Sequence, residues 1–360
     1  MKKAVFALLP ALILALVGCA SMLERDHISI TPYEPVSNSV DSSSALRVEN
    51  YQELVNAVLY LVSEGEEHGI LGLYNYTQDV EADLTRACLE VVQEDPLGAY
   101  AVDYIKHDYS LIVSYYEVNI YITYRRTPEQ VASIASVTGS SAIRRELSNT
   151  LTSFSSEAVL RVSYFAEDED YILDLVRQAY YDAPYAALGM PEVEVSLYPA
   201  AGQQRIVEIN LTYPVSPDIL RRRSQELKEL ALAQEPESAT AESLYETVLD
   251  GMTIEEGTGR SSAYDALIEG VADSEGAALA YQLLCDRIGL ESTVVLGELD
   301  GAPHFWNIIS GEDGMFRHVD LSAGLFSLTD EELTEQGAYE WAREEYPACV
   351  PSDSEEEILN

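Results

Sequence analysis

The stretch from Arg260 to Asp320 constrains the fold more than any other part of the chain. The segment Ala277 to Ile288 within it is rich in alanine and leucine, contains no glycine or proline, and repeats its apolar residues at helical spacing. It therefore predicts a buried helix. Gly289 follows as a stop signal, and Asp273 and Ser274 are residue types that favour the N-terminal cap of a helix.

Three segments with alternating apolar residues follow the helix: Thr293 to Leu299, His304 to Ile309 and Met315 to Leu321. The turn sequences between them contain Asp-Gly and Glu-Asp-Gly, which favour tight antiparallel hairpins. The pattern predicts a helix packed on an antiparallel sheet. It also predicts that the helix N-terminus faces a strand that carries a histidine, beside another strand that carries an aspartate.

The same stretch resembles the transglutaminase-like domain of bacterial surface lipoproteins, a member of the papain-like superfamily. The resemblance rests on four motifs: SAYDALIEG (262–270), EGAALAYQLLCDRIGL (275–290), HFWN (304–307) and FRHVD (316–320). It implies that His304 is the catalytic histidine and Asp320 the catalytic aspartate. Ser274 stands where the family has its nucleophilic cysteine, and Ala277 where the family has a tyrosine. Ser322 and Ala323, which come after Leu321, also depart from the Thr-Trp that often follows the family's aspartate.

The serine leaves two functions open. We expect a catalytically degenerate domain that serves as a binding or scaffold module for a cell-envelope protein or peptide, because a shared fold does not carry activity when the nucleophile changes. The alternative is an active acyl-transferase or peptidase that uses a Ser274-His304-Asp320 triad. Neither function calls for a cofactor. No metal site is expected either, because His68 and His107 lack clustered cysteine or carboxylate partners in the sequence.

The N-terminus predicts a lipoprotein. Lys2 and Lys3 precede an apolar run, Ala4 to Val17, that is short for a membrane span. Leu-Val-Gly-Cys at 16–19 resembles a bacterial lipobox, so residues 1–19 are expected to be a signal peptide and Cys19 the lipidated residue. The mature protein would then be anchored through its lipid on the extracytoplasmic face of the cell membrane. An ordinary secretory signal with an incidental cysteine is the alternative.

The region between this anchor and the helix-strand stretch contains two similar halves. Val118 to Tyr124 (VNIYITY) and Val207 to Tyr213 (VEINLTY) are alike and lie 89 positions apart, each preceded by a comparable order of expected helices and strands. We interpret this as an internal duplication that builds one compact body from residues 50–215. The expected α+β chain thus has these parts: a flexible tether (20–48), a duplicated α+β module (49–235), the transglutaminase-like domain (236–346) and an acidic disordered tail (347–360).

Charge and cysteine content set further limits. The chain has 62 acidic and 21 basic residues, which gives a net charge of −41. A chain with this charge would repel nucleic-acid backbones, so we do not expect it to bind nucleic acid. If Cys19 carries lipid, three cysteines remain. Cys88 and Cys285 are expected to be buried thiols, and a bridge to Cys349 stays open. Cys285 lies three turns beyond Ser274, about 16 Å along the helix axis, so it cannot replace the missing nucleophile.

Overall fold

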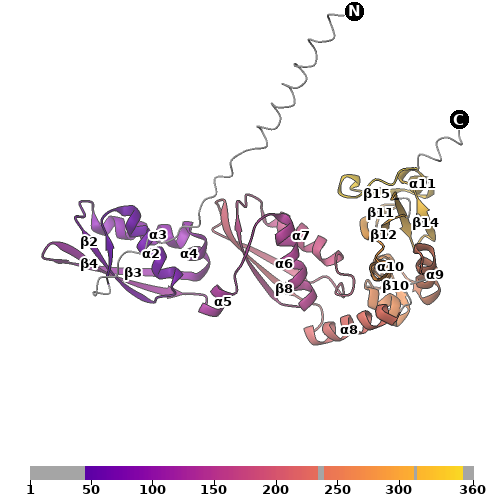
Figure 1. Ribbon diagram of the computed structural model, residues 1–360, viewed down its shortest axis with the longest axis horizontal. Helices are drawn as coiled ribbons and strands as arrows, with labels where there is room; N and C mark the ends of the chain where they lie inside the picture. The colour runs from indigo at the N-terminus through magenta and orange to yellow at the C-terminus, as the bar shows by residue number, and fades with distance from the viewer. Residues whose placement is uncertain (1–44, 234–238, 312–313, 352–360) are drawn as a thin grey trace, which may run out of the picture.

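The computed structural model describes residues 45–233, 239–311 and 314–351. Figure 1 shows three α+β lobes that follow one another along the chain: a first lobe (45–126), a second lobe (127–213) and a C-terminal lobe (239–351). The predicted α+β fold class is confirmed. The predicted signal peptide, Cys19 and most of the tether lie outside the described residues. Among the described residues, no helix combines the length and the apolar character that crossing a bilayer requires.

The first lobe is a four-stranded sheet with helices on one face. Its strands have the order β1-β2-β4-β3, with β1 parallel to β2 and the remaining pairs antiparallel. Asn50 and Asp79 cap the two long helices by accepting hydrogen bonds from backbone N–H groups. The elements are β1 (Ala45–Val48), α2 (Tyr51–Ser63), β2 (His68–Tyr74), α3 (Val80–Glu94), α4 (Pro96–Ala101), β3 (Val102–Ile112) and β4 (Tyr115–Tyr124).

The second lobe has the same strand order. Its sheet runs β5-β6-β8-β7, again with the first pair parallel and the others antiparallel. The two strands whose sequences are alike, β4 and β8, occupy equivalent positions in their sheets. The duplication itself stays a prediction. The elements are α5 (Pro128–Ala132), β5 (Ala135–Val137), α6 (Ser140–Ser153), β6 (Glu157–Ser163), α7 (Glu169–Tyr181), β7 (Glu192–Tyr198) and β8 (Gln204–Thr212).

The hydrophobic cores do not follow the expected domain plan. The first lobe has its own core, and a small cluster that includes Tyr100, Val159 and Ile206 joins it to the second lobe. The core of the second lobe continues instead through α8 (Pro217–Ala233) into the C-terminal lobe. The two halves of the expected body, residues 50–215, therefore have separate main cores that meet at this small cluster. The second lobe and the C-terminal lobe share a core, because apolar side chains of α8 pack with those of the central C-terminal helix.

The C-terminal lobe is a five-stranded sheet of order β14-β13-β12-β11-β15 with one buried helix, α10 (Ser274–Ile288), against it. The two hairpins that the turn sequences predict are present as β11-β12 and β12-β13. Its other elements are α9 (Ala241–Gly251), β9 (Thr253–Ile254), the π-helix η2 (Asp265–Glu269), β10 (Val271–Ala272), β11 (Ser292–Leu299), β12 (Ala302–Ser310), β13 (Phe316–Asp320), β14 (Leu325–Leu328), α11 (Asp330–Gln336), β15 (Tyr339–Trp341) and the 3₁₀ turn η3 (Arg343–Glu345).

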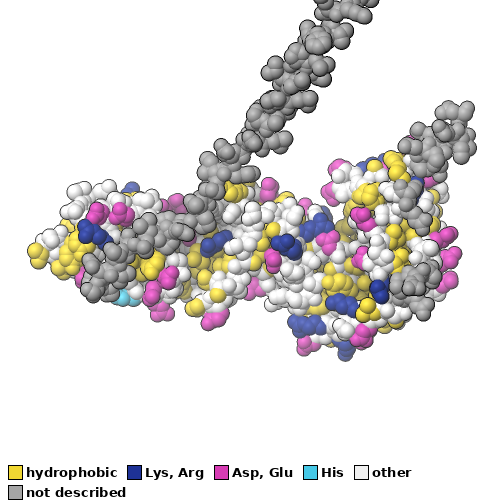
Figure 2. All heavy atoms as spheres, in the orientation of Figure 1, with side chains coloured by type: hydrophobic (Ala, Val, Ile, Leu, Met, Phe, Trp, Pro, Cys, Tyr) yellow, Lys and Arg dark blue, Asp and Glu magenta, His cyan; other side chains and the backbone are white. Residues whose placement is uncertain are grey.

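The structure corrects the two ends of the predicted domain plan. Residues Ala45–Val48, placed in the tether, form strand β1, because they pair with β2. Cys349, placed in the acidic tail, is 1% exposed and belongs to a hydrophobic cluster with Trp306 and Leu333. The sequence of residues 338–345 on its own predicts a short helix, but the structure contains edge strand β15 and a single 3₁₀ turn there. Acidic side chains are spread over all three lobes on the face that Figure 2 shows.

Candidate active site

Ser274 is the first residue of α10, where the sequence predicts the N-terminus of a helix. Asp273 is the N-cap, and its side chain accepts a hydrogen bond from Gly276 N at 3.1 Å. Ser274 itself is 2% exposed. The backbone N–H groups at the start of a helix are unpaired and carry a partial positive charge. Ser274 N is therefore suited to holding a negatively charged oxygen.

That oxygen is supplied by Glu256. The Glu256 carboxylate accepts a hydrogen bond from Ser274 N at 3.1 Å and one from Ser274 Oγ at 3.4 Å. Glu256 lies in the short loop between β9 and the π-helix η2. Sequence reasoning missed this residue. Nothing in its spacing distinguishes Glu256 from the adjacent Glu255.

His304 and Asp320 face each other from neighbouring strands. His304 Nε2 lies 2.6 Å from Asp320 Oδ2, and Asp320 is fully buried. Tyr339 Oη, Ser322 Oγ and Ala323 N also donate hydrogen bonds to this carboxylate, at 2.8, 2.8 and 3.0 Å. Burial on its own would raise the pKa of Asp320, but the hydrogen bonds it accepts, together with the charge that His304 carries when protonated, hold it below its ordinary value.

The hydrogen bond to Asp320 fixes the role of each His304 ring nitrogen. Asp320 has a lowered pKa and is therefore a carboxylate that accepts, so Nε2 carries the proton that is donated to it. Nδ1 of the neutral ring then has a free lone pair, and it has no hydrogen-bond partner among the described residues. A base in this state can accept an N–H or O–H from a ligand or from a nucleophile.

The three residues that the sequence predicts lie at one end of the C-terminal lobe, but they do not form one hydrogen-bonded chain. A cavity of about 510 Å³ is lined by both Glu256 and His304, together with Ser322. Within the part of the chain that the structure describes, Ser274 makes no hydrogen bond to His304. Its hydroxyl and its backbone N–H are both directed to Glu256. The Ser274 hydroxyl therefore contacts a carboxylate and not the His304 imidazole, and the same carboxylate occupies the N–H that would hold an oxyanion.

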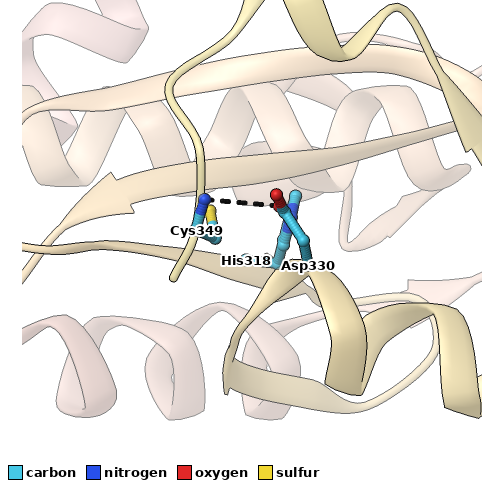
Figure 3. A group of neighbouring side chains, drawn as sticks. All are labelled: His318, Asp330 and Cys349. Carbon is cyan, nitrogen blue, oxygen red and sulfur yellow. Dashed lines mark hydrogen bonds and ion pairs between the residues drawn. The ribbon is translucent and has the colours of Figure 1, made fainter. Parts of the chain in front are cut away.

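A second cluster in this lobe combines residue types that bind metal ions. His318, Asp330 and Cys349 place one ligand atom each within 4.8 Å of one another, and Figure 3 shows them joining β13, α11 and the C-terminal segment. The indole N–H of Trp306 can only donate, so His318 Nδ1 must accept its hydrogen bond. His318 Nε2 then bears the proton and donates to Asp330 at 2.8 Å. Neither ring nitrogen of His318 has a free lone pair for a metal ion. The cluster instead holds the C-terminal segment, because the backbone N–H of Cys349 donates to Asp330 at 3.3 Å.

The cysteines of the described chain are all free. Cys88, Cys285 and Cys349 are buried, and burial raises the pKa of each thiol to about 12. The expectation of buried thiols for Cys88 and Cys285 agrees with this, and the bridge to Cys349 that the sequence left open is not formed. A thiol with such a pKa is almost entirely protonated at neutral pH and a poor nucleophile.

Glu275, next to Ser274, should make stability depend on pH. Burial raises its pKa to about 7, while a hydrogen bond from Tyr181 Oη at 2.9 Å acts in the opposite direction. The native state thus holds a proton that the unfolded state loses near pH 4.5, so stability falls as the pH rises from about 4.5 to 7. We expect Glu275→Gln to raise the free energy of unfolding by about 1–2 kcal/mol at pH 8 and to change it little at pH 4.5. Urea denaturation of both proteins at the two pH values measures this, and an equal effect at both would contradict it.

Comparisons with known proteins find only solved structures of low similarity. No family model matches the chain, and no curated protein matches it. Among solved structures, it is similar to a TGase, with 15% identity and a TM-score of 0.25, over 47% of this chain and 52% of that one. It is also similar to a candidate protease from Parabacteroides distasonis, with 9% identity and a TM-score of 0.22, over 59% of this chain and 47% of that one. The chain thus spans about half the length of each of these structures.

Proposed function

We propose that this protein is a lipid-anchored extracytoplasmic lipoprotein whose transglutaminase-like domain binds an envelope peptide or protein and does not catalyse acyl transfer. The observation that carries this proposal is the engagement of Ser274 by Glu256. Both groups that acyl transfer needs at this residue, the hydroxyl and the backbone N–H, are bonded to one carboxylate. The developing oxyanion of acyl transfer requires a free donor, and Glu256 already occupies the N–H of Ser274.

The remaining groups of the site are suited to binding. The cavity beside His304 is open and of a size typical of ligand pockets. His304 Nδ1 can accept an N–H from an extended peptide, and Asp320 holds the ring in position. Ser322 Oγ lines the same cavity. An extended peptide presents such N–H donors along its length, which makes it the chemical class that this surface fits.

The alternative is a slow serine hydrolase, and the short His304-Asp320 hydrogen bond favours it. In that case Glu256 would move away from Ser274 when substrate enters. The two functions differ in whether Ser274 reacts. A serine-directed fluorophosphonate should leave the wild-type protein unlabelled, and a pool of synthetic peptides should be retained by wild type and Ser274→Ala but not by His304→Ala. A covalent adduct on Ser274 would favour the hydrolase, and a failure of wild type to retain any peptide would refute the binding role.

The lipid anchor is tested independently of the site. We expect the intact mass of the protein extracted from membranes to correspond to a chain that starts at Cys19 and carries acyl groups, because Leu16-Val17-Gly18-Cys19 closes the apolar run of the signal peptide. The matched control is Cys19→Ser, which should lose the acyl mass. A mature chain that begins elsewhere and carries no lipid would exclude this anchor.

A further inference from the structure

A second cavity, of about 560 Å³, lies between the second lobe and the C-terminal lobe. We call it the interlobe cleft. Its lining residues come from α6 and α7 on one side and from α10, β11 and the segment around η3 on the other. Clefts of this volume between domains are common places for small ligands. None of Ser274, His304 and Asp320 lines it, so the interlobe cleft is separate from the candidate active site.

The basic side chains of the interlobe cleft are already occupied. Arg144 forms a bidentate ion pair with Asp182 and donates a further hydrogen bond to Gln178 at 3.0 Å. Arg177 pairs with Asp174 of the same helix at 2.7 Å. An anionic ligand would therefore have to displace an existing partner from one of these arginines.

One acceptor of the interlobe cleft, by contrast, is open. Asp286 is exposed in the cleft, and its carboxylate has no hydrogen bond and no ion pair within the described ranges. Partial burial of the carboxylate and the nearby charge of Asp182 raise its pKa to about 6. The carboxylates of Asp182 and Asp286 thus lie close together, and of the two only Asp182 is paired with an arginine, Arg144.

Gln282, which also lines the interlobe cleft, has a side-chain oxygen that lacks a hydrogen-bond donor. Its Nε2 donates to the backbone carbonyl of Tyr181 at 3.0 Å. A carbonyl oxygen can only accept a hydrogen bond, so the amide nitrogen of Gln282 must face Tyr181. The amide oxygen then points elsewhere and needs a donor of its own. Oε1 is buried without a hydrogen-bond partner, and the residue as a whole is 5% exposed. A buried acceptor left unpaired is unfavourable, and a donor from a ligand would offset that cost.

We propose that the interlobe cleft binds the cationic side chain of a peptide, with Asp286 as the counter-ion of its ammonium or guanidinium group and Gln282 Oε1 as a second acceptor. The rings of Tyr181 and Tyr346 also line the cleft and can contact the apolar stem of a lysine or arginine. This site lies beyond the function proposed for the His304 cavity and does not depend on it.

The experiment titrates the full chain with Nα-acetyl-lysine-N-methylamide by calorimetry, and uses the norleucine analogue as a neutral probe of similar shape. We expect the lysine derivative to bind, the norleucine analogue not to bind, and Asp286→Asn to weaken binding about tenfold. Glu331→Gln is the matched control, since Glu331 is exposed on α11 and its substitution changes the net charge equally. It should alter the affinity less than twofold.

Any cation is attracted weakly to a chain of net charge −41. The test of a specific site is therefore whether Asp286→Asn weakens binding more than Glu331→Gln does. Equal losses in Asp286→Asn and Glu331→Gln would overturn the proposal, as would undiminished binding in Asp286→Asn or no binding to wild type.

Discussion

Replacing Asp320 by alanine is expected to lower the free energy of unfolding by about 3–5 kcal/mol, the largest effect on stability that we predict for a residue of the candidate site. The carboxylate is fully buried and accepts hydrogen bonds from His304, Tyr339, Ser322 and the backbone of Ala323. Alanine would leave all of these donors without their partner in the interior. Buried polar groups that lose their partners are among the most destabilising outcomes of a single substitution.

Asparagine should not rescue this loss, although it has nearly the same shape as aspartate. Oδ1 accepts from Ser322 and Ala323, and Oδ2 accepts from His304 and Tyr339, so each carboxylate oxygen faces two donors. An asparagine NH₂ group at the Oδ1 position would face the N–H of Ala323, and at the Oδ2 position it would require both the His304 tautomer and the Tyr339 hydroxyl to reverse their roles. Urea denaturation would measure both variants. Asp218→Ala is the control, since the Asp218 side chain is 94% exposed, and it should change stability by less than about 0.5 kcal/mol. A stable Asp320→Asn protein would show that the network does not require a carboxylate at this position.

The sequence predicted the parts of the C-terminal lobe that local signals determine. The helix, its cap at Asp273 and its stop at Gly289 lie as expected, because capping residues and a glycine in the left-handed conformation act within a few positions of one another. The hairpins follow for the same reason. Asp300 and Gly301 both have positive φ, as a tight two-residue hairpin turn requires.

The sequence did not predict what depends on distant pairing. Strand β15 is an edge strand of three residues whose hydrogen bonds come from β11, more than 40 positions earlier, so its own sequence suggested a helix. Tyr339 enters the Asp320 network only because of that pairing. Glu256 was missed for a comparable reason, since its contact with Ser274 arises from the path of a loop and not from a repeated pattern. The shared core of the second and C-terminal lobes likewise depends on the docking of α8, which a composition-based boundary at 235 cannot reveal.

The Ser274-Glu256 contact leads to the last prediction, which concerns a thiol placed at this helix N-terminus. In Ser274→Cys the helix dipole should favour the thiolate, since cysteines in such positions have pKa values of about 3.5–7.5. The Glu256 carboxylate opposes this, because it would lie beside the sulfur and repel a second negative charge. Position 274 is only 2% exposed, so the comparison is between variants that share this burial. We expect Ser274→Cys alone to react slowly with iodoacetamide at pH 7, and the double variant Ser274→Cys/Glu256→Gln to react about tenfold faster, which corresponds to a decrease of about one pKa unit.

The chain offers clean controls for this measurement. Cys88, Cys285 and Cys349 are buried with pKa values of about 12, so wild type gives a low background rate. Glu255 precedes Glu256 in the same loop and is also exposed, but it makes no contact with Ser274, so Ser274→Cys/Glu255→Gln should react as slowly as Ser274→Cys. Equal acceleration by both glutamate substitutions would mean that general charge, and not the contact, controls the thiol. If wild type hydrolyses acyl esters and Ser274→Ala abolishes the reaction, Glu256 does not silence the serine, and the binding-module proposal fails.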